Sequence, residues 1–224
     1  MFKMHSGFTL AEVLVTLGII GVVSALTLPT LVKSHQRQVY VTQLHKVYNQ
    51  VSQAVELYMN DQRAVSLSET RIRNNGAKLN EFFHTYFKVV KDCNGSYVPC
   101  FADEYQTLDG SKTINLKHWK CNVVVTLADG VAICADSQTE EVSKDENDED
   151  VINGYDEKNS IALEFDINGR QGPNIYGRDY FSFEVDSRGN IFDSNKAKHE
   201  NGVNPSELFG FVSRIIDDGW KMDY

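Results

Sequence analysis

The sequence predicts an α+β fold in which one long N-terminal helix packs on an antiparallel β domain with short helices. Three observations lead to this prediction: an almost uncharged run near the N-terminus, an apolar stripe at helical spacing after it, and strand-like segments separated by turns in the rest of the chain. About 190 of the 224 residues follow the uncharged run, enough for one globular domain with its own core. The predicted segments are a leader at residues 1–7, an apolar half of the helix at 8–32, an amphipathic half at 33–62 and a globular domain at 63–224.

The uncharged run extends from Phe8 to Val32, which makes 25 residues with a single formal charge. A helix of that length is about 37 Å long, whereas the hydrocarbon core of a bilayer is roughly 30 Å thick. We therefore expect this half of the helix to span a membrane. The single charge is Glu12, and an acid in lipid costs on the order of a few kcal/mol, so we expect it to have a functional partner.

Glu12 gains a candidate partner if the chain is cut between Gly7 and Phe8. The cut exposes an α-amino cation four residues before Glu12, and the amine of a neighbouring copy could reach the carboxylate. Two unit charges about 4 Å apart attract by about 4 kcal/mol at an effective dielectric of about 20, which is comparable to the cost of inserting the acid. A single subunit in the membrane then bears the full cost of inserting the acid, whereas in a packed subunit the ion pair offsets that cost.

Gly7 followed by Phe8-Thr9-Leu10-Ala11-Glu12 and the apolar run resembles the class III signal of type IV prepilins and of the pseudopilins of type II secretion. The resemblance covers residues 1 to about 60. It implies that a membrane-embedded aspartyl prepilin peptidase cuts after Gly7 and methylates the new amine of Phe8. It also implies that Glu12 sets the register between subunits during filament assembly.

The same resemblance implies that Pro29 bends the helix and, together with Gly18 and Gly21, bounds a stretch that unwinds when subunits pack. Proline removes a backbone hydrogen bond and glycine is a poor helix former, so the residue types agree with this role. The implied fold is pilin-like. The implied partners are other pilin or pseudopilin subunits, the prepilin peptidase and the assembly machinery of the inner membrane, with the precursor in that membrane and its globular domain exported to the periplasm or cell surface.

An ordinary secretory signal peptide is one alternative interpretation of the N-terminus, with Val23-Ser24-Ala25 as its cleavage site. Glu12 stands at the head of the apolar stretch, and the apolar character continues past this site to Val32, so the anatomy argues against a signal peptide. A plain single-span anchor is a second alternative.

Charge counting does not support an exported domain. Lys3 is the only Lys or Arg before the span, whereas Lys33, Arg37 and Lys46 follow it. The positive-inside rule alone would keep the large domain in the cytoplasm. The outward orientation therefore depends on the family resemblance.

Beyond the span, the helix is predicted to continue to about Asp61. Apolar residues recur there at intervals of three and four, which predicts a single stripe that packs on the globular domain. These residues are Tyr40, Leu44, Val47, Val51, Val55 and Tyr58.

The globular domain is predicted from its local patterns. A loop from Arg63 to Gly76 precedes an aromatic-rich helix from Lys78 to Lys91, and an acidic stretch at residues 138–150 is expected to be a solvated loop. Strand pairs and a last helix are expected further along. These elements are a hairpin of Cys121–Leu127 with Val131–Cys134, a hairpin of Phe181–Val185 with Asn190–Phe192, a helix that begins at Asn204-Pro205 and ends at Gly219, and a docked tail from Trp220 to Tyr224.

The four cysteines, Cys93, Cys100, Cys121 and Cys134, all lie in the predicted exported domain, so two disulfides are expected. Pairing Cys93 with Cys100 closes a short turn. The second pair is open: a two-residue turn at Asp129-Gly130 would place Cys121 roughly 13 Å from Cys134, beyond disulfide reach. A wider loop or a crossed pairing would then be needed.

A loop dense in Gly, Asn and Asp lies between two strand-like segments at residues 165–183. Oxygen-bearing side chains on a tight, glycine-bearing turn suit a hard cation such as Ca²⁺. The candidate ligands are Asp166, Asn168, Asn174 and Asp179. The alternative is that these side chains form Asx turns without a metal, and the pattern lacks the closing Glu of an EF-hand loop.

Composition and motifs narrow the function. Lys and Arg number 22 against 31 Asp and Glu, and the formal net charge of −9 disfavours a nucleic-acid partner. The six histidines are scattered, and no nucleophile elbow, phosphate loop or His-Glu-x-x-His motif occurs, so enzymatic activity is unsupported. Two functions remain: a structural, minor subunit of a filament, or a filament-tip or membrane-tethered adhesin or substrate-binding module, in one version calcium-dependent.

Overall fold

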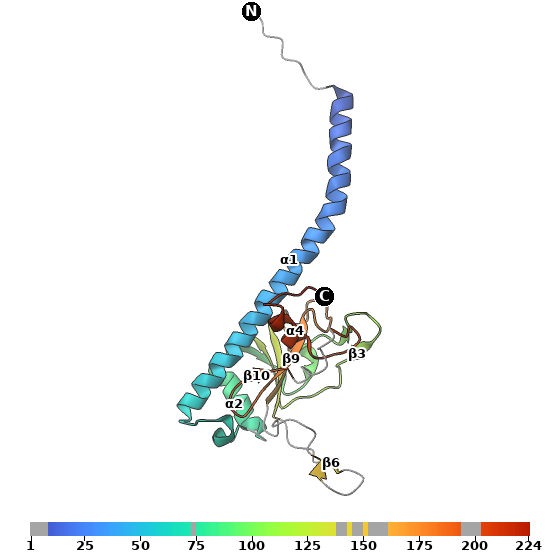
Figure 1. Cartoon of the computed structure of the whole chain (residues 1–224). Helices are drawn as coiled ribbons and strands as arrows, with labels where there is room; N and C mark the ends of the chain where they lie inside the picture. The colour runs from blue at the N-terminus through green and yellow to red at the C-terminus, as the bar shows by residue number, and fades with distance from the viewer. Residues whose placement is uncertain (1–8, 73–74, 138–142, 145–149, 152–160, 194–202) are drawn as a thin grey trace, which may run out of the picture. The chain divides into compact units, whose positions relative to one another are not determined.

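The structure is a computed structural model of the whole chain, and it describes residues 9–72, 75–137, 143–144, 150–151, 161–193 and 203–224. It divides into two compact units, Met1–Val39 and Tyr40–Tyr224. Helix α1 (Leu10–Asp61) belongs to both units, and the strands and other helices lie in the second (Figure 1). The predicted α+β, pilin-like fold is confirmed. The leader and the Gly7–Phe8 bond lie outside the described residues.

The first part of α1, from Leu10 to Val39, is exposed; it is apolar as far as Val32 and polar from Lys33 to Gln38. Its side chains are all exposed except Ser24 and Arg37, which are half-buried. None of the large apolar residues in this stretch is buried. The α-helix satisfies its backbone hydrogen bonds within the segment, which is the condition for an apolar medium to surround it.

The second part of α1 buries one stripe of side chains, as the spacing predicts. The helix ends at Asp61, where Arg63 adopts a left-handed conformation with φ 53° and the amide of Ala64 donates to the carbonyl of Met59. Tyr40 is only partly buried. The buried residues of the stripe are Val41, Leu44, Val47, Val51, Ala54, Val55 and Tyr58.

Helix α2 (Gly76–Tyr86) is shorter than the sequence predicts. Its N-cap is Asn75, whose side-chain oxygen accepts the amide of Lys78 at 3.1 Å. The expected continuation to Lys91 is wrong, because Val89–Asp92 forms the edge strand β1 and pairs with β4 (Val123–Leu127). Two adjacent β-branched residues favour the extended backbone, and the pairing with β4 completes their hydrogen bonds.

One six-stranded antiparallel sheet forms the centre of the second unit, with strand order β1-β4-β5-β8-β9-β10. Both predicted hairpins are present in it, as β4 with β5 and as β9 with β10. The remaining strands of this sheet are β5 (Ala132–Ser137), β8 (Ile161–Asp166), β9 (Tyr180–Val185) and β10 (Ile191–Phe192).

Several short elements were not expected from the sequence. The loop after α1 holds a 3₁₀ turn, η1, and the acidic stretch holds the strand pair β6 and β7, whereas its residues 138–142 and 145–149 lie outside the described residues. A second small sheet pairs β2 with β3. The bounds are η1 Leu67–Thr70, α3 Tyr97–Cys100, β2 Glu104–Gln106, β3 Thr113–Asn115, β6 Ser143–Lys144 and β7 Asp150–Val151.

The last helix, α4 (Phe211–Asp217), starts later than its Asn-Pro signal predicts. Gly210 stands at the N-cap with φ 97°, and a left-handed residue there separates the preceding turn from the helix. The tail docks as expected: the Trp220 ring stacks on His45 with 3.9 Å between centroids, and the Tyr224 hydroxyl donates to the carbonyl of Gly177 at 2.9 Å.

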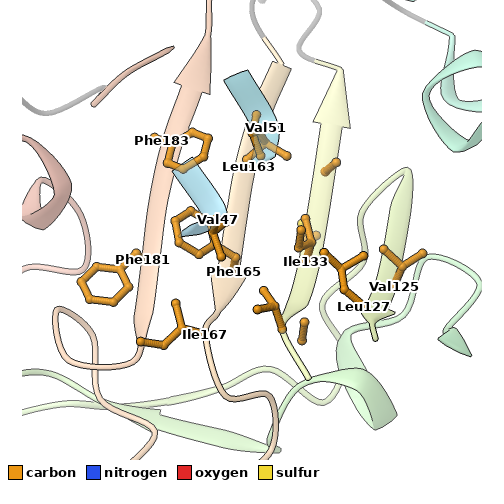
Figure 2. Close-up of a cluster of buried hydrophobic side chains, with 14 of the residues drawn as sticks. Val47, Val51, Val125, Leu127, Ile133, Leu163, Phe165, Ile167, Phe181 and Phe183 are labelled. Carbon is orange, nitrogen blue, oxygen red and sulfur yellow. The ribbon is translucent and has the colours of Figure 1, made fainter. Parts of the chain in front are cut away.

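The hydrophobic core lies between the second part of α1 and one face of the sheet. Figure 2 shows Val47 and Val51 of α1 against side chains from several strands. Because the strands are antiparallel and alternate in side-chain direction, each contributes residues to this layer at every second position. The labelled strand residues are Val125 and Leu127 of β4, Ile133 of β5, Leu163 and Phe165 of β8, and Phe181 and Phe183 of β9.

Candidate functional site

The first turn of α1 contains a reciprocal cap. The backbone amide and the hydroxyl of Thr9 each donate to Oε2 of Glu12 at 2.8 Å, and the amide of Glu12 donates to the Thr9 hydroxyl at 3.3 Å. This is a capping box, which satisfies amides that a helix start leaves unpaired. Glu12 therefore has partners inside its own chain, which the sequence analysis missed although the Thr-x-x-Glu spacing signals it.

The remaining assembly candidates lie on the exposed part of α1. A Cβ added at Gly18 or Gly21 would meet no atom within 4 Å in the described part of the chain, so packing there does not require either glycine. Pro29 lies inside the helix, which is continuous around it. The unwinding expected between Gly18 and Pro29 stays a prediction.

Two hydroxyls on the exposed part of α1 are hydrogen-bonded to the helix backbone. Thr16 donates to the carbonyl of Val13 at 3.0 Å, and Thr27 donates to the carbonyl of Val23 at 2.9 Å. Such internal bonds lower the cost of a hydroxyl in an apolar medium, because the donor already has a partner. By length and composition, α1 is the one helix among the described residues that could cross a membrane.

Residues 2–28 match the family model of the prokaryotic N-terminal methylation motif. The N-terminus is a class III prepilin signal. This prepilin signal is typical of type IV pilins and pseudopilins, which are structural proteins rather than enzymes. Together with the long apolar helix, the prepilin signal fits membrane anchoring of a precursor. No curated protein and no solved structure matches the chain.

Two disulfides occur in the globular unit, as expected. Cys93 is bonded to Cys100 and Cys121 to Cys134, with Cα atoms 6.1 and 5.9 Å apart. The two-residue turn assumed at Asp129-Gly130 is wrong, because Leu127 pairs with Val131 across a three-residue turn.

The wider turn shortens the offset between Cys121 and Cys134 from four residues to three, which along a straight strand would still be about 10 Å. It places Cys134 opposite Val124, and Cys121 lies before β4 begins, where its amide donates to the carbonyl of Gly95 at 2.9 Å. The chain bends at Asn122, between Cys121 and β4, so the distance along a straight strand does not apply.

The four predicted calcium ligands lie close together at the ends of β8 and β9. Asp179 accepts the amides of Asn174 and Ile175, each at 2.7 Å, and the Asn168 side chain also hydrogen-bonds to its carboxylate. Asp166 accepts the amide of Asn168 at 2.9 Å, which is an Asx turn. The carboxylates thus already have structural partners, as the metal-free alternative expects.

The electrostatics of this loop are unusual, because Asp166 and Asp179 are both fully buried. Burial, and then the nearby charge of Asp179, raise the pKa of Asp166 well above its usual range, and burial raises the pKa of Asp179 to about 6. The amide oxygens of Asn168 and Asn174 are buried without a partner among the described residues. Within that part of the chain, no three His, Cys, Asp or Glu side chains gather as a metal site.

A buried tyrosine network that the sequence did not reveal lies next to this loop. Glu164 accepts the hydroxyls of Tyr97, at 2.7 Å, and Tyr180, and Asp166 accepts the hydroxyl of Tyr105 at 2.6 Å. Burial, followed by the nearby carboxylates, raises the pKa of Tyr97 and Tyr105, so these phenols remain protonated donors. The network joins β8 and β9 to α3 and β2, and we assign it a structural role.

Proposed function

We propose that the protein is a minor pilin or pseudopilin, a structural subunit of a type IV pilus or of a type II secretion filament. Prepilin peptidase cuts between Gly7 and Phe8, and the subunit assembles through the first part of α1. The observation that carries the proposal is the coincidence of the prepilin signal with a helix segment whose large apolar side chains are all unburied. In the precursor pool lipid covers this segment, and in the filament the helices of other subunits cover it.

Glu12 has a defined role in this assembly. In a single chain its carboxylate is held by Thr9, so docking of a neighbour exchanges or extends an existing set of hydrogen bonds. The cationic amine of Phe8 on the next subunit adds the charge that the Thr9 donors lack. An ion pair at about 4 Å contributes about 4 kcal/mol at an effective dielectric of about 20, enough to favour one register strongly.

Three substitutions separate the charge of Glu12 from its capping role. Glu12→Ala removes both, Glu12→Gln keeps an oxygen that accepts from Thr9 but has no charge, and Thr9→Ala keeps the charge and removes the hydroxyl. In cells that contain the assembly machinery, we expect both Glu12 variants to be inserted and cleaved normally. The amount of the protein in sheared filaments should fall at least about tenfold for both, and by less for Thr9→Ala.

Normal incorporation of Glu12→Gln would contradict the charge-pairing mechanism. N-terminal sequencing of the mature protein tests the proposal separately, because a subunit begins at Phe8, whereas a secreted domain released by signal peptidase begins at Leu26. The ratio of this chain to the main filament component then tests the minor role, for which a small fraction is expected.

A further inference from the structure

A short basic and aromatic run stands out in the acidic second unit. Lys117-His118-Trp119-Lys120, here named the basic-aromatic loop, lies after β3 in a chain with a formal net charge of −9. All four side chains are exposed, and 38% of Trp119 is accessible. Tryptophan is enriched at binding surfaces, where its ring supplies a large apolar contact area.

The loop is held rigidly by its surroundings. The amide of Tyr97 donates to the carbonyl of Trp119 at 3.3 Å, and the backbones of Lys120 and Ser96 form an isolated antiparallel β-bridge. The rings of Tyr97 and Trp119 meet edge to face with centroids 5.8 Å apart. The two disulfides fix both sides of this contact, since Cys93–Cys100 closes the segment that carries Tyr97, and Cys121 follows the loop directly.

Close approach of the two segments also depends on Gly95. Its φ is +74°, and a Cβ at this position would lie 2.6 Å from the carbonyl oxygen of Cys121. A partner that binds here therefore meets a surface that is already ordered, so binding costs little conformational entropy.

The charges around the loop leave its cations available. The nearby carboxylates have other partners: Asp103 lies 3.6 Å from Arg170, Glu104 accepts from Asn115, and Asp136 accepts the amide of Asn122. Lys117 and Lys120 form no ion pair with the described part of the chain. Two exposed lysines thus flank the partly exposed indole ring of Trp119 in the sequence.

We propose that the basic-aromatic loop binds an acidic polysaccharide. A sugar ring stacks on the open part of Trp119, and carboxylates of the sugar units meet the ammonium groups of Lys117 and Lys120. This pairing uses both features of the loop, because the ring offers an apolar surface to the C–H face of a sugar and the lysines offer charge-assisted hydrogen bonds.

The surrounding charge favours a sparsely charged polymer over the other common polyanions. A nucleic acid is held by many phosphate contacts, which two lysines in a domain of net negative charge do not supply. A membrane surface is usually bound by an amphipathic helix or a polybasic cluster with several inserted apolar side chains, and the loop exposes a single ring. A uronate-containing chain needs only one or two ionic contacts for each stacked sugar.

The test uses the full-length protein in detergent and polygalacturonate oligosaccharides, with neutral galactan oligosaccharides of similar length as the control ligand. Binding is measured by calorimetric titration at low and moderate salt. The variants are Trp119→Ala and Lys117→Gln/Lys120→Gln, and the matched control is Lys221→Gln, which changes an exposed lysine in the C-terminal tail.

We expect the wild type and Lys221→Gln to bind the acidic oligosaccharide alike and the neutral one at least tenfold more weakly. Each loop variant should lose about tenfold in affinity, and the double lysine variant should also lose the salt dependence of binding. The lysine variants keep the test valid if Trp119→Ala loosens the contact with Tyr97. Equal binding of galactan, unchanged affinity in the lysine variants, or tighter binding of duplex DNA or of phosphatidylglycerol vesicles would overturn the proposal.

Discussion

The two parts of α1 use the same backbone for different surroundings. From Leu10 to Val32 the helix exposes apolar side chains over its whole circumference, whereas from Tyr40 to Asp61 it buries one stripe and exposes mainly polar residues elsewhere. Leu17 is 61% exposed and Leu44 is fully buried, although both are leucines of one continuous helix. Among the residues that the structure describes, the first part therefore has no packing partner and the second part has one.

The environments of the acidic side chains also differ between the two regions. Glu12 is held at a helix start by Thr9, in a segment whose large apolar side chains are exposed. Asp166 and Asp179 are covered by the folded unit itself and accept amides of their own loop. The first arrangement leaves a carboxylate available for a neighbour, and the second uses carboxylates to fix a loop.

The largest expected effect separates the two parts of α1 by a pair of matched substitutions. Leu44→Ala creates a cavity in the core and should lower the free energy of unfolding of the globular unit by about 2–5 kcal/mol, which corresponds to a melting temperature lower by about 10 °C. Leu17→Ala should change it by less than about 0.5 kcal/mol. Near-UV circular dichroism of the full chain in detergent measures both transitions, and equal shifts would show that the two parts are not distinct.

The success of the sequence analysis follows the same division. The apolar run and the stripe from Leu44 to Tyr58 repeat over many turns, so the whole of α1 could be predicted within two residues. The conformation of the short elements instead depends on pairing with segments that are distant in the sequence. Val89–Asp92 became strand β1 because β4 was available beside it, and no periodicity within four residues can reveal that.

The candidate sites were predictable to the extent that they lie on local patterns. The prepilin signal is contiguous, and the loop from Asp166 to Asp179 is contiguous as well, so both could be read from the chain. The β-bridge between Lys120 and Ser96 joins segments that are separate in the sequence, so no local pattern indicates it. The tyrosine network around Glu164 likewise joins residues that are far apart in the sequence.

A smaller effect, the pH dependence of the free energy of unfolding, tests the buried acids of the globular unit. The folded pKa of Asp179 is about 6, above the usual value of 3.8, so between about pH 4 and pH 6 the folded state holds a proton that the unfolded state has released. Stability must then fall as the pH rises through this window. Burial also raises the pKa of Asp166 well above its usual range, so Asp166 contributes a fall of the same sign. Urea midpoints measured from pH 4 to pH 7 with a chelator should show it.

The control for this prediction has the opposite sign. The amide of Ser111 and the hydroxyls of Thr107 and Ser111 lower the pKa of Asp109 to about 2, so its contribution is lost only as the pH falls below about 4. Asp179→Asn should flatten the slope between pH 4 and pH 6, and Asp109→Asn should leave it unchanged. A slope of the same size in Asp179→Asn would contradict the assignment.

Added calcium tests the predicted cation site in the same experiment. If the oxygens of Asp166, Asn168, Asn174 and Asp179 bind Ca²⁺, the ionised carboxylates become favourable and stability near pH 7 should rise, by about 2.7 kcal/mol at a concentration of about 100 times Kd. Magnesium should act more weakly, because it prefers a smaller octahedral site. Identical urea midpoints with calcium and with chelator would show that these side chains do not bind calcium and serve only in the hydrogen bonds of the loop.

The smallest expected effect tests whether the two parts of α1 are independent. Thr9→Val removes the hydroxyl that bonds Glu12 and should destabilise the first turn by about 1 kcal/mol, because a cap of this kind has that magnitude. Amide exchange at residues 10–13, measured in detergent micelles, should accelerate about fivefold, since that free energy corresponds to this factor. Thr16→Val, which removes a hydroxyl bonded to Val13 but no cap, should have little effect there. Exchange at residues 44–55 should be the same in both variants, because their protection comes from packing on the sheet. Faster exchange at those residues in Thr9→Val would mean that the helix start is coupled to the globular unit.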